Sequence, residues 1–112
     1  MTGTVALVRE AVASVGIGRP VAERLAAYLD LLLRANEEMN LVSGREAVPE
    51  NLVSRHLLDA LEALPLLPAP AGRRLRLLDV GSGGGFPAVP LLVVREDVEG
   101  VLVESTGKKA RF

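Results

Sequence analysis

A run of glycines that follows a short apolar segment is the part of the sequence best suited to bind a ligand. Residues 75–80 read Leu-Arg-Leu-Leu-Asp-Val, a run apolar enough for a buried strand, and residues 81–85 read Gly-Ser-Gly-Gly-Gly. Glycine is needed where the backbone takes a positive φ or where a ligand lies too close for a Cβ atom. The pattern therefore predicts a strand that turns sharply beneath a bound cofactor.

The residues after the glycines complete a strand–helix–strand unit that ends in an acid. Phe86 and Pro87 are expected to open a helix, because proline is favoured in a first turn. A second strand is expected at residues 101–103, and Glu104 follows it directly. A carboxylate about 20 residues after the glycines can accept hydrogen bonds from both hydroxyls of a ribose, as in nucleotide-binding βαβ units.

The glycine spacing does not fit a dinucleotide cofactor. The G-x-G-x-x-G fingerprint requires glycine at its sixth position, and counting from Gly81 that position is Phe86. An NAD-dependent oxidoreductase is therefore disfavoured, and the remaining pattern is Asp79-x-Gly81-x-Gly83-x-Gly85. A glycine-rich turn without special function is the alternative, but strand, turn, helix and acid agree with a binding motif.

Composition limits the class of protein. The 112 residues fit one small domain, and a hydrophobic content of 49% argues against disorder. The chain has no cysteine, which excludes disulfides and thiolate metal sites, and we expect no metal. It has neither a long apolar run nor a signal-peptide pattern, so we expect a soluble cytoplasmic protein without a membrane partner. With a net charge of −1, nucleic-acid binding would depend on local basic patches.

Two helical segments must precede the glycine motif. Valines at helical spacing predict a short amphipathic helix over residues 5–15, which Gly16 would end. A longer helix is expected from Pro20, where Asn36 and Asn40 lie one turn apart at its end and can terminate it. Its apolar stripe consists of Val21, Leu25, Tyr28, Leu32, Ala35 and Met39.

A third helix is expected to run to about Leu64. Two starts are possible, because Ser43 and Glu46 have the spacing of a capping box while Pro49 favours a first turn. His56, the only histidine, lies beside the apolar face of this helix. A histidine paired with an aspartate three residues later is usually an ordinary hydrogen bond, which leaves its function open. A proline-rich linker follows and separates residues 1–66 from residues 67–112.

Four separated motifs stand out, namely Asn36-x-x-x-Asn40-Leu41, Arg55-His56-x-x-Asp59, residues 78–87 and residues 107–112. Together they resemble those of the bacterial 16S rRNA guanine-7 methyltransferase family RsmG, formerly called glucose-inhibited division protein B. The resemblance covers roughly residues 21–112. It departs from the family at Val42, where threonine is usual, at Ala88, where glycine is usual, and at Glu104, where aspartate is common.

The resemblance implies an α/β fold. The glycine motif is similar to motif I of the class I S-adenosylmethionine (SAM) methyltransferases, which have a Rossmann-like, mostly parallel seven-stranded sheet. Residues 1–66 would then form the N-terminal helical region, and residues 67–112 the first βαβ unit of the SAM-binding domain. Because the other strands of that sheet are missing, we expect an N-terminal fragment of doubtful independent stability.

The resemblance also implies a function, namely SAM-dependent methylation of guanine at ring nitrogen seven in 16S rRNA. The cofactor would be SAM, and the partner 16S rRNA or the small ribosomal subunit, with the protein acting as a monomer. A noncatalytic remnant, or a SAM enzyme with another substrate, is the alternative.

Site residues follow from the same resemblance. The cofactor is expected at the glycine motif and at the end of the second strand, and the substrate beside the third helix. RNA phosphates are expected at the basic cluster after Glu104, for which a solvated basic face is the alternative. The cofactor residues are Asp79, Gly81, Gly83, Gly85, Phe86, Glu104, Ser105 and Thr106, the substrate-side catalytic residues Asn40, His56 and Asp59, and the RNA contacts Lys108, Lys109 and Arg111.

Overall fold

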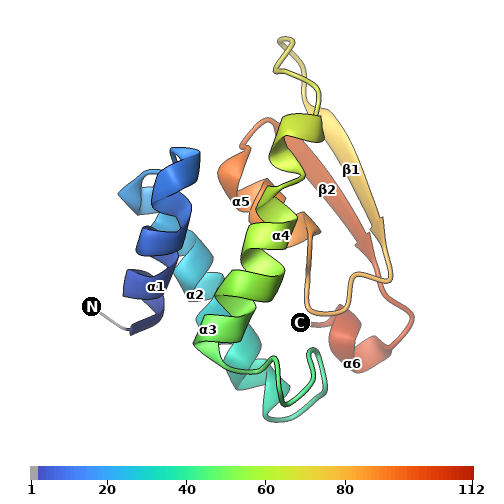
Figure 1. Cartoon of the computed structure of the whole chain (residues 1–112). Coiled ribbons are helices and arrows are strands. Elements are labelled where there is room, and N and C mark those ends of the chain that lie inside the picture. Colours follow the sequence, from blue (N-terminus) through green and yellow to red (C-terminus); the bar gives the residue numbers. More distant parts are fainter. Residues whose placement is uncertain (1–2) are drawn as a thin grey trace.

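The structure is a computed structural model that describes residues 3–112. Helices precede a pair of parallel strands, and helix α5 lies between the strands and the other helices (Figure 1). This arrangement confirms the expected mixture of helices with a small parallel sheet. The elements are α1 (Gly3–Val12), α2 (Arg19–Asn36), α3 (Pro49–Asn51), η2 (Leu52–Leu57), α4 (Leu58–Leu61), β1 (Leu75–Val80), α5 (Ala88–Val94), β2 (Val98–Val103) and α6 (Gly107–Ala110).

Helix α1 is shorter than its valine pattern predicts. Val8 and Val12 are fully buried against the core, but the chain tightens into a 3₁₀ turn over Ala13–Val15. Val15 is consequently 54% exposed and does not extend the buried stripe. Gly16 then takes a left-handed conformation and ends the segment, as expected for glycine after a helix.

Helix α2 carries the predicted apolar stripe into the core and ends at Asn36. Leu25, Tyr28 and Leu32 are all buried. The side-chain oxygen of Asn36 accepts hydrogen bonds from the backbone N–H groups of Leu41, at 2.8 Å, and of the next residue, at 2.9 Å. The helix therefore stops one turn before Asn40, which lies in the following loop.

The third helix is continuous from Pro49 to Leu61 and begins at the proline, not at the Ser43–Glu46 capping box. The carbonyl of Ser43 instead accepts from the N–H of Glu46 in a separate turn. Its middle part, η2, is π-helical, and the N–H of Leu58 bonds to the carbonyl five residues earlier. The helix ends before the expected limit, and a 3₁₀ turn covers Leu64–Leu66.

Strands β1 and β2 pair in parallel, with Leu75 opposite Val98 and Val80 opposite Val103. Strand β2 therefore starts three residues before the predicted 101–103, because its register must match the whole length of β1. The expectation of a buried β1 is wrong, because even the face of Leu75, Leu77 and Asp79 is only partly buried. On the other face Leu78 is 64% exposed, because within residues 3–112 no element packs against it.

Helix α5 joins the strands to the N-terminal helices in one hydrophobic core. It packs against β2, α2 and α4. Phe86, Val89 and Val93 contact the buried cluster formed by α1, α2 and the third helix. The glycine segment before α5 is consequently held against α2. None of the helices formed by residues 3–112 has the length and apolar character needed to cross a membrane.

Candidate active site

The glycine loop, residues 81–87, connects β1 to α5 with a left-handed backbone at alternate positions. Gly81, Gly83 and Gly85 have φ values of 76°, 51° and 100°, a region that favours glycine. A Cβ atom on Gly81 would meet nothing within 4 Å. The N–H of the same residue donates to the carbonyl of Val103 at 2.7 Å. The loop is thus tied to the end of β2 while one side of its backbone stays open.

Asp79, near the end of β1, carries a buried carboxylate oxygen. Its Oδ2 atom has no hydrogen-bond partner within the part of the chain that the structure describes. Buried polar atoms in folded proteins are nearly always paired, so an orphaned oxygen of this kind calls for an explanation. It is free to accept from a donor that a ligand brings.

Glu104 faces the glycine loop, at the place where the sequence puts the ribose-binding acid. Its Oε1 atom accepts from the N–H of Gly83, and its Oε2 atom accepts from the N–H of Thr106, both at 2.9 Å. These bonds, led by the one from Thr106, lower the pKa of Glu104. The carboxylate is therefore held in its charged form, and each oxygen keeps a lone pair for a further donor.

A cavity of about 290 Å³ lies beside the loop and the acid. Gly83, Gly85 and Glu104 line it, and helix α2 contributes Tyr28 and Leu31. Its size is at the lower end of the range for small-molecule sites. The structure thus brings Gly83, Gly85 and Glu104, all predicted cofactor residues, to one cavity, whereas no residue of α2 was among the predicted site residues.

The other predicted cofactor residues lie elsewhere. Gly81, Ser105 and Thr106 are exposed and do not line this cavity. Phe86 lines a second cavity of about 220 Å³, together with His56 and further residues of the third helix. The glycine loop therefore borders two cavities, one lined by its residues up to Gly85 and the other by Phe86 and Pro87.

The second cavity brings together two of the three predicted substrate-side residues. His56 and Asp59 both line it, and the imidazole of His56 stacks on the ring of Phe86, with centroids 5.2 Å apart and planes at 28°. Asn40 is exposed in the loop after α2 and lines neither cavity. Within residues 3–112, no group of histidine, aspartate and glutamate side chains is arranged to hold a metal ion.

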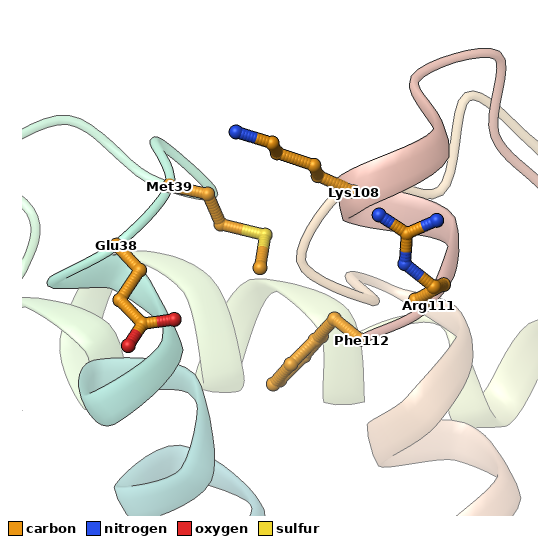
Figure 2. A pocket seen from close by; sticks show the side chains of 5 residues that line it. All are labelled: Glu38, Met39, Lys108, Arg111 and Phe112. Carbon is orange, nitrogen blue, oxygen red and sulfur yellow. The ribbon is translucent and has the colours of Figure 1, made fainter.

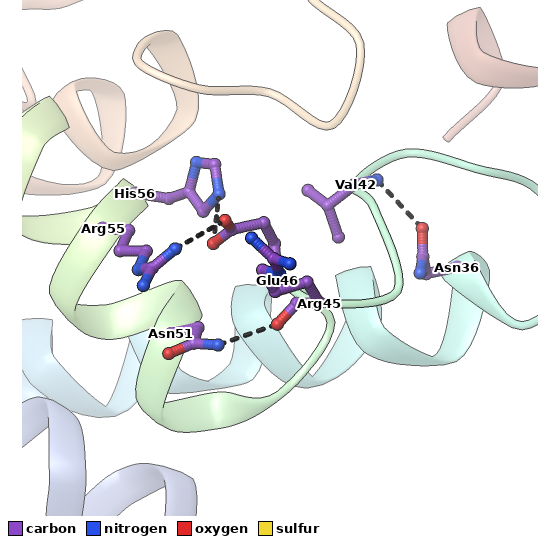
Figure 3. A network of polar contacts seen from close by, with 7 residues as sticks. All are labelled: Asn36, Val42, Arg45, Glu46, Asn51, Arg55 and His56. Atoms are coloured by element: carbon purple, nitrogen blue, oxygen red, sulfur yellow. Dashed lines mark hydrogen bonds and ion pairs between the residues drawn. The ribbon is translucent and has the colours of Figure 1, made fainter.

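Glu46, which the sequence suggested only as part of a helix cap, contacts two residues that line this cavity. One of its oxygens lies 3.1 Å from Nη1 of Arg55, and the other lies 3.4 Å from Nε2 of His56 (Figure 3). Both partners belong to the π-helical segment η2. Segments of this kind occur frequently at functional sites.

Aromatic rings, counting the imidazole of histidine, are scarce in this chain, yet three of them lie together at the loop. The sequence has one tyrosine, two phenylalanines and one histidine. Tyr28 meets Phe86 edge-on, with centroids 5.5 Å apart and planes at 65°, while His56 stacks on the same ring. Their scarcity is a signal in the sequence that could have marked Tyr28 as a site residue.

The basic residues after Glu104 divide between two places. Lys108 and Arg111 border a cavity of about 330 Å³ that is also lined by Glu38 and Met39, from the turn after α2 (Figure 2). Lys109 instead lines the cavity beside the glycine loop, and its charge contributes to the lowered pKa of Glu104. The predicted RNA contacts therefore line two different cavities.

Residues 21–112 match the model of a protein family described as rRNA small subunit methyltransferase G. The chain belongs to this family. The match includes Tyr28, the third helix, the glycine loop and Glu104, whereas helix α1 lies outside it.

Curated relatives agree with this assignment to the rRNA small subunit methyltransferase G family. Three proteins named ribosomal RNA small subunit methyltransferase G, from Azoarcus sp. (strain BH72), Ectopseudomonas mendocina and Halorhodospira halophila, are 41%, 46% and 45% identical over 105, 90 and 93 residues. These matches cover 92%, 80% and 83% of this chain but only 47%, 40% and 41% of the relatives. The chain thus spans less than half the length of the relatives it matches.

We expect the carboxyl group of Glu104 to titrate below its ordinary pKa of 4.5. Because its pKa is lowered by folding, its contribution to stability is complete above pH 4.5 and is lost as the pH falls through the folded value. The measurement is an NMR titration that follows the backbone amides of Gly83 and Thr106. A midpoint at or above 4.5 would contradict the two hydrogen bonds, and in Glu104→Gln this transition should be absent.

Proposed function

We propose that the chain binds SAM at the glycine loop and contributes to an enzyme that methylates guanine at ring nitrogen seven in 16S rRNA. The family match carries this proposal, and the ionised Glu104 bonded to Gly83 supports it. The fold would be that of the class I, Rossmann-like methyltransferases. Residues 1–66 would form the helical region and residues 67–112 the first βαβ unit of the cofactor-binding domain.

The residues present fit SAM in several respects. The open side of Gly81 leaves room for a ligand against bare backbone, and the unpaired oxygen of Asp79 can accept from an ammonium group. We propose that Gly81 and Phe86 flank the methionine and adenosine portions. Glu104, with the exposed Ser105 and Thr106, would recognise the ribose and the adenine edge. The remaining proposed contacts are the backbones of Gly83 and Gly85.

The chemistry asks for positioning more than for proton transfer. SAM supplies a methyl group that is activated by a sulfonium centre. Ring nitrogen seven of guanine carries a lone pair and no proton, so the protein needs no general base. Holding the reacting atoms in a near-attack arrangement contributes roughly 7–11 kcal/mol. Carboxylates such as Asp79 and Asp59 suit a site where both the donor and the methylated base are cationic.

The substrate side is proposed at the second cavity. His56 and Asp59 line it beside Phe86, and Asn40 would approach the base from the loop after α2. Phosphate groups of the RNA would contact the basic residues Lys108, Lys109 and Arg111. The partner would be 16S rRNA or the small ribosomal subunit, and the protein would act as a cytoplasmic monomer.

Label transfer tests the proposed reaction directly. The protein expressed from its complete reading frame is incubated with methyl-labelled SAM and with unmodified 16S rRNA or small subunits. We expect label at ring nitrogen seven of guanine, mapped by chemical cleavage at that modified base. Label on another atom or another molecule would overturn the proposed substrate, and SAM binding without transfer to either RNA substrate would indicate a noncatalytic module.

The replacement Glu104→Ala tests the cofactor assignment. It removes the two hydrogen bonds that the ribose hydroxyls of SAM would donate to the charged carboxylate. Each bond is worth about 1.5–3 kcal/mol, so we expect the affinity for SAM to fall at least tenfold. Isothermal calorimetry on the folded protein measures the change. Glu99→Ala, which removes an exposed acid from β2, the strand that precedes Glu104, is the matched control and should leave the affinity unchanged. An unaltered dissociation constant in Glu104→Ala would exclude the assignment.

Removal of the charges of Lys108 and Arg111 tests the RNA contacts. If both side chains contact phosphates, the double alanine variant should bind rRNA more weakly and reduce the salt dependence by about two units of slope. Lys109 is left intact, because it lines the same cavity as Glu104. The double variant of Arg73 and Arg74, which are exposed before β1, removes the same charge elsewhere. An equal slope in all proteins would return Lys108 and Arg111 to a solvated face.

A further inference from the structure

Gly84 is the point where the glycine loop rests on helix α2. Its carbonyl accepts a buried hydrogen bond of 2.6 Å from the hydroxyl of Tyr28, a residue 56 positions earlier in the chain. A Cβ atom on Gly84 would lie 3.0 Å from Cδ1 of Leu32 and 3.6 Å from Cβ of Leu41. The loop therefore contacts α2 through its backbone. Within the described residues, Tyr28 is the side chain that donates a hydrogen bond at this contact.

Tyr28 contacts the next two loop residues as well. A Cβ atom on Gly85 would lie 3.0 Å from the Tyr28 hydroxyl, and the ring of Phe86 meets the tyrosine ring edge-on. One side chain thus touches three successive residues of the loop. Since Tyr28 also lines the cavity that Gly83 and Glu104 share, its position is linked to the geometry of the proposed cofactor site.

The loop after α2 also lies against Gly84, close to Leu32 of the helix. Leu41 reaches Gly84 because the side-chain oxygen of Asn36 binds the backbone N–H of Leu41 and closes the loop after α2. Gly84 therefore contacts both the helix and this loop, and its carbonyl is bonded to Tyr28.

The bond from Tyr28 is suited to a permanent role. Burial raises the pKa of the Tyr28 hydroxyl well above its ordinary value of 10.0, so the group stays a donor at any working pH. Without this donor the carbonyl of Gly84 would be buried without a partner, which is costly in a protein interior. The loop would then gain by rotating the carbonyl towards another donor.

We propose that Tyr28 is a positioning residue that fixes the glycine loop in the conformation that binds SAM. Its hydroxyl sets the orientation of the Gly84 peptide. This orientation in turn positions the backbone of Gly83 and Gly85, which lines the cavity. The N-terminal helical region thus takes part in cofactor binding through α2. This inference rests on the proposed function for its ligand, but the effect on the loop is independent of it.

The variant Tyr28→Phe keeps the ring and removes only the donor. With the protein expressed from its complete reading frame, we expect the dissociation constant for SAM to rise about fivefold or more at a temperature where the variant is fully folded. Val12→Ala is the control, because it removes buried packing from α1, away from the glycine loop, and lowers the melting temperature without touching the donor. An unchanged SAM affinity in Tyr28→Phe, with a melting temperature lowered as in Val12→Ala, would reduce Tyr28 to a core residue and overturn the proposal.

Hydrogen exchange separates this inference from the proposed function. The amides of Gly85 and Val89 bond to carbonyls of the loop itself, so their protection reports its conformation without any ligand. Relative to amides within the β1–β2 ladder, these two should exchange several-fold faster in Tyr28→Phe but not in Val12→Ala. If the wild-type protein does not bind SAM, the proposed cofactor is wrong. The comparison of exchange rates still tests whether Tyr28 fixes the conformation of the loop. Equal relative protection in all three proteins would overturn the inference.

Discussion

The backbone of Gly84 lies against helix α2, where a Cβ atom would come within 3.0 Å of the Leu32 side chain, and much of the fold serves to keep that contact. Helix α2 can meet the loop because its opposite side is fixed by α1, whose Val8 and Val12 are fully buried. Helix α5 fixes the C-terminal end of the loop, since it packs against both α2 and β2. A shift of α2 by the width of one methyl group would therefore be felt at the proposed cofactor site, because packed interiors have no slack to absorb it.

The sequence predicts the local parts of this arrangement well. Strand β1, the glycine turn, helix α5 and the acid after β2 each have a signal within a few neighbouring residues, such as apolar runs, clustered glycines or a proline near a helix start, although α5 begins at Ala88, after the predicted Phe86 and Pro87. The end of α2 at Asn36 is of the same kind, because its side chain bonds to backbone only five and six residues later. Contacts between residues so close in the chain can be predicted from the local sequence.

Contacts between distant segments have no comparable local signal. Tyr28 falls on the apolar stripe of α2, where periodicity cannot tell a core tyrosine from one whose hydroxyl reaches the glycine loop. Glu46 has the spacing of a helix cap, but its charge is used by Arg55 and His56 across a turn of the chain. The π-helical segment η2 likewise was not predicted, because helical periodicity over residues 49–61 does not distinguish it from an α-helix.

That π-helical segment also changes how the third helix can vary. It fits one residue more than an α-helical turn, so the side chains after it are rotated by about 100° relative to an unbroken helix. The helix can consequently pack its first half on α1 and α4 on α5, although these neighbours lie in different directions. Loss of a single residue between Leu52 and Leu57 would restore α-helical phase and turn Asp59 away from Phe86. The length of this segment is therefore constrained more tightly than its composition, whereas the exposed linker before β1 can gain or lose residues at little cost.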